Sequence, residues 1–198
     1  MTPILLTPRR FADDRGWFAE TFHDQRFRDL GVDANFVQDN HSYSRLAGTI
    51  RGIHFQRDPH VQAKLVRCVR GRIYDVAIDL RRASPTFGQH VAAELSADNG
   101  KQLFVPAGYG HAFMTLEDDC EVIYKVDAYY APESEGGLRW DDTDLAIHWP
   151  SPAGGIAAPV LSPKDAVLPS LSDAAFSFDY DGTPVSYTHL TLPTTERV

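Results

Sequence analysis

The sequence predicts an all-β fold, a sandwich or barrel of short strands with a few short helices, and two observations predict it. In residues 72–80, large apolar side chains at every second position alternate with Asp75, Ala77 and Asp79, which is the period of a strand with one buried face. Similar runs recur after turn-rich segments such as 81–88, at residues 90–96, 101–108, 111–116 and 120–130. Short strands at this spacing are typical of sandwiches and barrels.

Helices are predicted in only two places. Residues 23–32 favour a helix that ends at Gly31. Residues 162–171 favour a second one, with Ser162 as the N-cap and Pro163 in the first helical position, where a missing N–H costs nothing.

Length and composition indicate one domain. A chain of 198 residues with 43% apolar content can bury a single sizeable core, which we assign to residues 1–184. The last fourteen residues, 185–198, read VSYTHLTLPTTERV and differ in composition from the rest of the chain, with four threonines. They resemble a translated cloning scar, so we expect a non-native or disordered tail; a native flexible tail is the alternative.

Charge and cysteine content exclude several classes of protein. The net charge of -8 repels nucleic acid, and no apolar run approaches the length of a membrane span. We therefore expect a soluble, cytoplasmic protein without nucleic-acid or membrane partners. Cys68 and Cys120 lie far apart and form no CxxC motif, so they predict small core residues rather than a zinc site or a disulfide framework.

Two histidine motifs raise the question of a metal. PAGYGH, ending in His111, resembles the later metal-binding motif of cupin barrels, in which two histidines and a glutamate on an earlier strand pair complete the site. The earlier motif, RGIHFQ, has His54 but carries Gln56 two residues later, and His60 fits only an irregular site. Because a metal needs its full ligand set, we predict no metal; a metal-dependent cupin enzyme remains an alternative.

Polar residues on apolar strand faces predict a lined pocket. Lys64 and Tyr124 each alternate in phase with apolar residues, so both are expected to face inward with His54 and His111. A histidine is a base near neutrality, a tyrosine is a weak acid, and a lysine is a fixed cation. Together they can remove a proton next to a carbonyl, hold the enolate and return a proton from the opposite face.

Seven motifs between Phe11 and Leu171 together resemble the dTDP-4-dehydrorhamnose 3,5-epimerases. In order they are DDRGWFAETF, FVQDNHS, RGIHFQ, KLVRCVRGRIYDVAIDLRRASPTFG, FVPAGYGHAF, VIYKVDAYYAPESEGGLRWDD and LSPKDA. The resemblance implies a cupin-type jelly roll without cofactor. It also implies a homodimer that acts on dTDP-4-dehydro-6-deoxy-D-glucose and makes dTDP-4-dehydro-L-rhamnose.

The resemblance also implies roles for individual residues. His54 matches the general base and Asp165 its orienting carboxylate, while Tyr124 matches the general acid. Lys64 is assigned to the enolate oxygen at carbon 4, and His111 lines the same pocket. Arg51 is assigned to the diphosphate and Tyr130 to stacking on thymine. Further substrate contacts are assigned to Arg15, Glu20, Gln38, Asn40, Glu135 and Lys164, some of them reaching across the dimer interface.

Several alternatives stay open at this point. Strict alternation places Arg51 and His54 on opposite faces unless Gly52 relaxes the strand. Asp165 also suits the first turn of a helix without catalysis, and Arg15 also suits a surface charge cluster. Rival functions are a mono-epimerase or ketoisomerase on the same substrate and a non-catalytic sugar-binding module.

Overall fold

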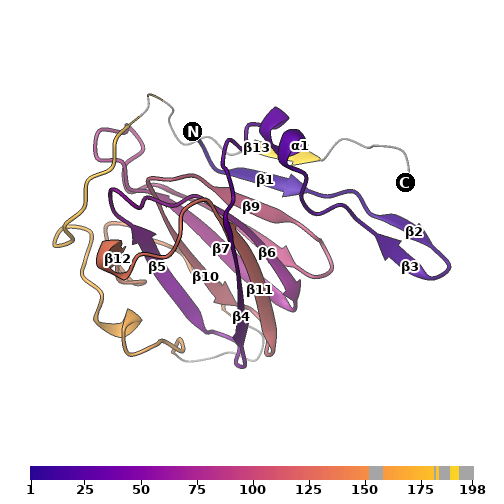
Figure 1. Cartoon of the computed structure of the whole chain (residues 1–198). Helices are drawn as coiled ribbons and strands as arrows, with labels where there is room; N and C mark the ends of the chain where they lie inside the picture. The colour runs from indigo at the N-terminus through magenta and orange to yellow at the C-terminus, as the bar shows by residue number, and fades with distance from the viewer. Residues whose placement is uncertain (152–157, 181, 183–187, 192–198) are drawn as a thin grey trace.

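Two β-sheets packed face to face form the body of the protein (Figure 1). The computed structural model describes residues 1–151, 158–180, 182 and 188–191. One sheet contains β13 (Thr188–Thr191), β1 (Ile4–Thr7), β9 (Gln102–Val105), β6 (Lys64–Arg70), β11 (Cys120–Val126) and β4 (Gln38–Ser44), in that order. The other contains β12 (Glu135–Gly137), β5 (Ile50–Gln56), β10 (Tyr109–Thr115), β7 (Arg72–Asp79) and β8 (His90–Ser96). The predicted all-β, cupin-like jelly roll is confirmed.

The core has two main layers because both faces of the five-stranded sheet are buried. Between the sheets, alternate residues of β7 such as Ile73 and Ala77 pack against the inner faces of β6, β9 and β11. On the outer face, Val76 and Ile78 pack under a segment that includes Leu138, Leu145, Leu171, Phe176 and Phe178. The prediction of one buried face for β7 was therefore wrong. The covering segment buries the face that alternation marked as apolar, and the acidic face points between the sheets.

The first predicted helix is present and the second is not. The helix α1 (Asp24–Asp29) ends in a Schellman motif, in which Val32 N donates to Phe27 O over 2.9 Å and Gly31 has φ +89°. Residues 162–171 form only a 3-10 turn, η2 (Asp165–Val167). Pro169 disfavours helical backbone at Leu168, which is extended with ψ 145°.

The N-terminal hairpin of β2 (Phe11–Asp13) and β3 (Gly16–Phe18) stands away from the sandwich (Figure 1). Its second strand exposes Trp17 and Phe18, which are 57% and 67% accessible. Apolar rings of this size on a projecting hairpin are suited to contact with another surface. A second 3-10 turn, η1 (Pro132–Ser134), precedes β12.

The end of the chain contributes one strand. Within the predicted tail, Thr188–Thr191 forms β13, which pairs with β1 in parallel. Residues 185–187 and 192–198 lie outside the described residues, and the domain boundaries stay a prediction. Cys68 and Cys120 are buried free thiols, as expected. In the described part of the chain, no helix is both long and apolar enough to span a lipid bilayer.

Candidate active site

A cavity with two lobes lies between the sheets, and both lobes share His54, Lys64 and Tyr124. The first lobe has a volume of about 420 Å³ and the second about 260 Å³. Among the predicted site residues, the first lobe also contains Arg51, His111, Lys164 and Asp165, and the second contains Gln38, Asn40, Tyr130 and Glu135. The fold thus gathers every predicted site residue except Arg15 and Glu20.

A β-bulge in β5 places Arg51 and His54 on the same cavity. The register pairs Arg51 with Phe113 and His54 with His111, so two residues of β5 face one residue of β10. Gly52 supplies the irregular backbone with φ +114°, a conformation that L side chains rarely adopt. The bulge resolves the conflict with strict alternation, because it shifts the phase of the strand between the two residues.

Gly52→Ala is expected to destabilise the protein by about 2–4 kcal/mol and to impair any activity of the cavity. A Cβ at this position would lie 2.5 Å from His111 O and 2.9 Å from the Cα of Ala112. Urea denaturation measures the loss. Gly16→Ala is the matched control, since Gly16 also has positive φ but nothing within 4 Å of the new carbon. Equal losses in the two variants would mean that the close approach at Gly52 is unimportant.

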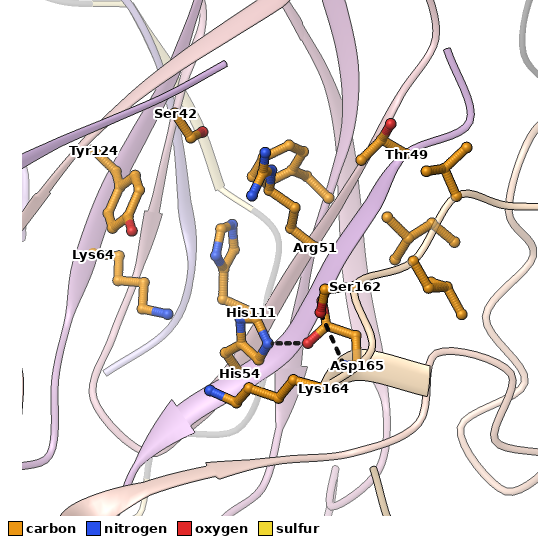
Figure 2. A pocket seen from close by; sticks show the side chains of 14 residues that line it. Ser42, Thr49, Arg51, His54, Lys64, His111, Tyr124, Ser162, Lys164 and Asp165 are labelled. Atoms are coloured by element: carbon orange, nitrogen blue, oxygen red, sulfur yellow. Dashed lines mark hydrogen bonds and ion pairs between the residues drawn. The ribbon is translucent and has the colours of Figure 1, made fainter. Parts of the chain in front are cut away.

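His54 is oriented by a buried carboxylate. Asp165 is 4% exposed, and its Oδ1 lies 2.6 Å from His54 Nε2 (Figure 2). Burial alone raises the pKa of Asp165, but hydrogen bonds from His54 and from Ser162 outweigh it, so its pKa lies below the ordinary value. The ionised carboxylate can only accept, so Nε2 of His54 carries the hydrogen. In the neutral form of the ring, Nδ1 then has the free lone pair that a base requires.

Lys64 is a buried amine whose pKa is lowered toward neutral pH. Its side chain projects between the sheets from β6, in phase with apolar residues as predicted, and the residue is 8% exposed. Burial lowers its pKa from 10.5 to about 8, although the charges of Asp75 and Glu135 act in the opposite direction. It forms neither a hydrogen bond nor an ion pair with any residue that the structure describes. The ammonium is thus available to an oxygen of a bound molecule.

Asp75 is a site residue that the sequence did not reveal. Its Oδ1 lies 2.8 Å from His111 Nε2, behind the wall of the first lobe. Alternation placed Asp75 on the exposed side of its strand, but it is completely buried. The signal that could have found it is an aspartate placed between two large apolar residues, Tyr74 and Val76, inside a predicted strand.

Tyr124 approaches the cavity from the sheet opposite His54. It lies on β11 of the six-stranded sheet, whereas His54 lies on β5, and Figure 2 shows them on different sides of the first lobe. Burial raises the pKa of Tyr124 and the charge of Arg51 lowers it, with a net rise. The phenol therefore keeps its proton at neutral pH. A ring bound between the two side chains would present one face to each of them.

Arg51 is the exposed cation at the rim of the first lobe. Its Nε donates to Ser44 Oγ over 3.1 Å, and its guanidinium also donates to Tyr43 O over 2.8 Å. Lys164 lies in the same lobe and forms an ion pair with Glu135. Two cations at one mouth of an acidic protein suit an anionic ligand such as a phosphate ester.

Besides the shared His54, Lys64 and Tyr124, the second lobe is lined by side-chain amides, by Glu135 and by the rings of Phe55 and Tyr130. Gln38 Nε2 donates to Asn40 Oδ1 over 2.8 Å, and Gln38 Oε1 accepts from the backbone of Tyr130 over 3.3 Å. The hydroxyl of Tyr130 donates to Glu135 over 3.0 Å, which fixes the exposed ring. The lobe therefore offers amide donors and acceptors beside an accessible ring face.

The Gln56 side chain is hydrogen-bonded to the backbone and is not oriented as a metal ligand. Its amide nitrogen donates to His60 O and Tyr129 O, over 2.7 and 3.2 Å, and its oxygen accepts from Ala131 N over 2.8 Å. His60 is turned to Ser134 Oγ, 2.9 Å away. Among the described residues, no group of three or more histidine, cysteine, aspartate or glutamate side chains is placed to hold a metal ion.

Arg15 and Glu20 lie outside the cavity of their own chain. Arg15 pairs with Asp13 at the tip of the N-terminal hairpin, with 88% of its side chain exposed. Glu20 pairs with Arg26 of α1. Neither lines either lobe. Their predicted contact with a ligand therefore needs the cavity of a second chain.

Comparisons of the sequence and of the structure with known proteins point to the same family. The family model described as dTDP-4-dehydrorhamnose 3,5-epimerase matches residues 2–173. An enzyme of that name from Sinorhizobium fredii is 50% identical over 89% of this chain and 88% of its own length. The Bacillus anthracis enzyme, solved with TDP and PPi bound, has TM-score 0.80 and 51% identity, over 84% of this chain and 92% of that one. A Legionella pneumophila epimerase, in complex with dTDP-4-keto-L-rhamnose, has TM-score 0.80 and 40% identity, over 85% and 87%.

Proposed function

Since this chain belongs to the dTDP-4-dehydrorhamnose 3,5-epimerase family, an isomerase family, we propose that it inverts carbons 3 and 5 of dTDP-4-dehydro-6-deoxy-D-glucose. The product is dTDP-4-dehydro-L-rhamnose. The single observation that carries the proposal is the placement of His54, Lys64 and Tyr124 around one cavity, with the base and the acid on opposite sheets. A base and an acid on two faces of a ring are what inversion requires.

The proposed reaction begins with proton removal next to the 4-keto group. Nδ1 of His54 takes the proton from carbon 3 or carbon 5, and the electron pair moves into the carbonyl to form an enolate. The Lys64 ammonium stabilises the enolate oxygen, which is the same atom in both events. Tyr124 then donates its proton to the opposite face of the carbon. Exchange with water removes the proton from His54 and restores it to Tyr124.

The nucleotide half of the substrate is assigned to the rim and the second lobe. The guanidinium of Arg51 and the ammonium of Lys164 supply positive charge for the diphosphate. The exposed face of Tyr130 supplies a stacking surface for thymine. Relatives of this fold were solved with TDP and PPi and with dTDP-4-keto-L-rhamnose, which supports a dTDP-sugar as the ligand.

We propose a homodimer in which the N-terminal hairpin completes the partner's cavity. The hairpin projects from the sandwich (Figure 1). Two large apolar side chains on it, Trp17 and Phe18, are exposed. Arg15 and Glu20 are assigned as substrate contacts, yet neither reaches the cavity of its own chain. If two chains exchange hairpins, Arg15 and Glu20 can contact the substrate in the partner's cavity although they lie outside their own.

Deuterium incorporation tests the proposed function. The protein is incubated with the 4-keto sugar nucleotide in deuterated water, and carbons 3 and 5 are followed by NMR. We expect deuterium at both carbons and conversion to the L-sugar. Label at carbon 3 alone would identify a mono-epimerase. No label at all would favour a binding module.

The pH dependence follows from Lys64. Its pKa lies near 8, below the ordinary 10.5, so the ammonium is lost as the pH rises through about 8. We expect kcat/KM to fall about tenfold for each further pH unit. Lys64→Arg keeps a charge at all these pH values, so its alkaline limb is expected to disappear even where its maximal rate is lower. An identical limb in both proteins would assign the limb to another group.

A further inference from the structure

Three buried ionisable side chains lie at the first lobe, Lys64 and His111 in its wall and Asp75 behind it. Lys64 projects from β6, Asp75 from β7 and His111 from β10, and none is more than 8% exposed. Two of them can carry a positive charge and one a negative charge. Burial of unbalanced charge is costly, so the charge state of the three is constrained as a set.

The contacts of Asp75 are unevenly divided between its two oxygens. Oδ1 accepts from His111 Nε2 over 2.8 Å. Oδ2 is buried and has no hydrogen-bond partner among the described residues. A buried carboxylate oxygen without a hydrogen-bond partner destabilises the folded protein. A function for the negative charge of Asp75 would offset this cost.

We propose that Asp75 is a positioning residue of the active site, which holds His111 with Nε2 protonated and supplies the negative charge that keeps Lys64 an ammonium ion. The inference rests on the proposed function, in which Lys64 stabilises the enolate. Asp75 does not line either lobe, so it acts through Lys64 and His111.

Charge counting supports this assignment. Burial lowers the pKa of His111, although the nearby Asp75 opposes the shift, so the ring is neutral at pH 7. A neutral ring that donates Nε2–H to a carboxylate leaves Nδ1 as an acceptor. The one negative charge of Asp75 then balances the one positive charge of Lys64. The ionisable groups around Lys64 from the neighbouring elements are Asp75, His111, His54, Tyr124 and Glu135.

Asp75→Asn separates the charge of Asp75 from its hydrogen bond. The amide oxygen can still accept from His111 Nε2, whereas the negative charge is lost. The pKa of Lys64 should then fall below its value near 8, since Asp75 raises it. With ¹³C-labelled lysine, we expect the NMR titration midpoint of Lys64 in the free protein to drop by about one pH unit or more. The alkaline limb of kcat/KM, which reports the free protein, should move by the same amount.

Asp79→Asn is the matched control. Asp79 is also fully buried on β7, four residues further along the same face, but it pairs with Arg81 and lies outside both lobes. We expect it to lower the melting temperature without moving either titration. An unchanged Lys64 midpoint in folded Asp75→Asn would overturn the inference, and so would equal shifts in the two variants.

A second measurement needs no variant. ¹⁵N chemical shifts of His111 in the wild-type protein report its tautomer, and we expect a neutral ring protonated at Nε2 at pH 7. An imidazolium, or a ring protonated at Nδ1, would contradict the inference. Neither the lysine nor the histidine titration requires turnover. A failure of epimerisation in the wild-type protein would therefore contradict the proposed function and leave these two results to be judged separately.

Discussion

His54→Asn is expected to slow deuterium exchange at carbons 3 and 5 by about 1,000-fold or more, because it removes the base and keeps the size of the side chain. Binding of the sugar nucleotide should change by less than roughly threefold, since the cations at the rim are untouched. NMR in deuterated water measures the exchange, and calorimetry measures the binding. The combination separates loss of chemistry from loss of the site.

His90→Asn serves as the control for this prediction. His90 is a partly buried histidine on β8, outside both lobes. The substitution should leave exchange within about threefold of the wild-type rate. Exchange that persists in the His54 variant would mean that another residue is the base. Asp165 would then have only a structural role in the η2 turn.

Tyr124→Phe is expected to uncouple exchange from inversion. The variant retains His54, which can remove a proton and return a solvent deuteron to the same face. It lacks the hydroxyl that supplies a proton to the other face. We therefore expect exchange to persist within about tenfold while formation of the L-sugar falls at least about 100-fold. NMR follows both quantities in one sample.

Tyr74→Phe is the matched control for the phenol. Tyr74 is also partly buried and has a raised pKa, but its ring packs against Trp149 on the outer face of the five-stranded sheet. Its loss should affect neither exchange nor inversion. Equal rates of inversion in wild type and Tyr124→Phe would exclude Tyr124 as the acid and direct attention to water in the cavity.

Strand periodicity predicted the part of the site that depends on side-chain direction alone. Lys64 and Tyr124 were placed inward from the phase of their apolar neighbours, and both line the cavity. Periodicity does not say what covers the other face of a sheet. It therefore misjudged β7, whose outer face is buried by residues far along the chain. Asp75 was missed for the same reason.

Local irregularities were the other limit of the sequence. The bulge at Gly52 changes the phase of β5, and its presence depends on the close approach of β10. Ser162 is a good N-cap and favours a helix at 162–171, but Pro169 disfavours helical backbone at the residue before it. The segment therefore forms only a short turn. Ser162 nevertheless caps the short turn, since its Oγ accepts from Asp165 N over 3.0 Å. The carboxylate therefore reaches His54 without a helix.

A structure of the protein with its dTDP-sugar bound tests the central claim most directly. The distances from the sugar ring to the side chains of His54 and Tyr124 are the quantities to measure. We expect His54 Nδ1 and the Tyr124 hydroxyl on opposite faces of the ring, each within about 3–3.5 Å of an atom it would serve, and the ketone oxygen beside Lys64. Both side chains on one face, or a ketone turned away from Lys64, would contradict the mechanism.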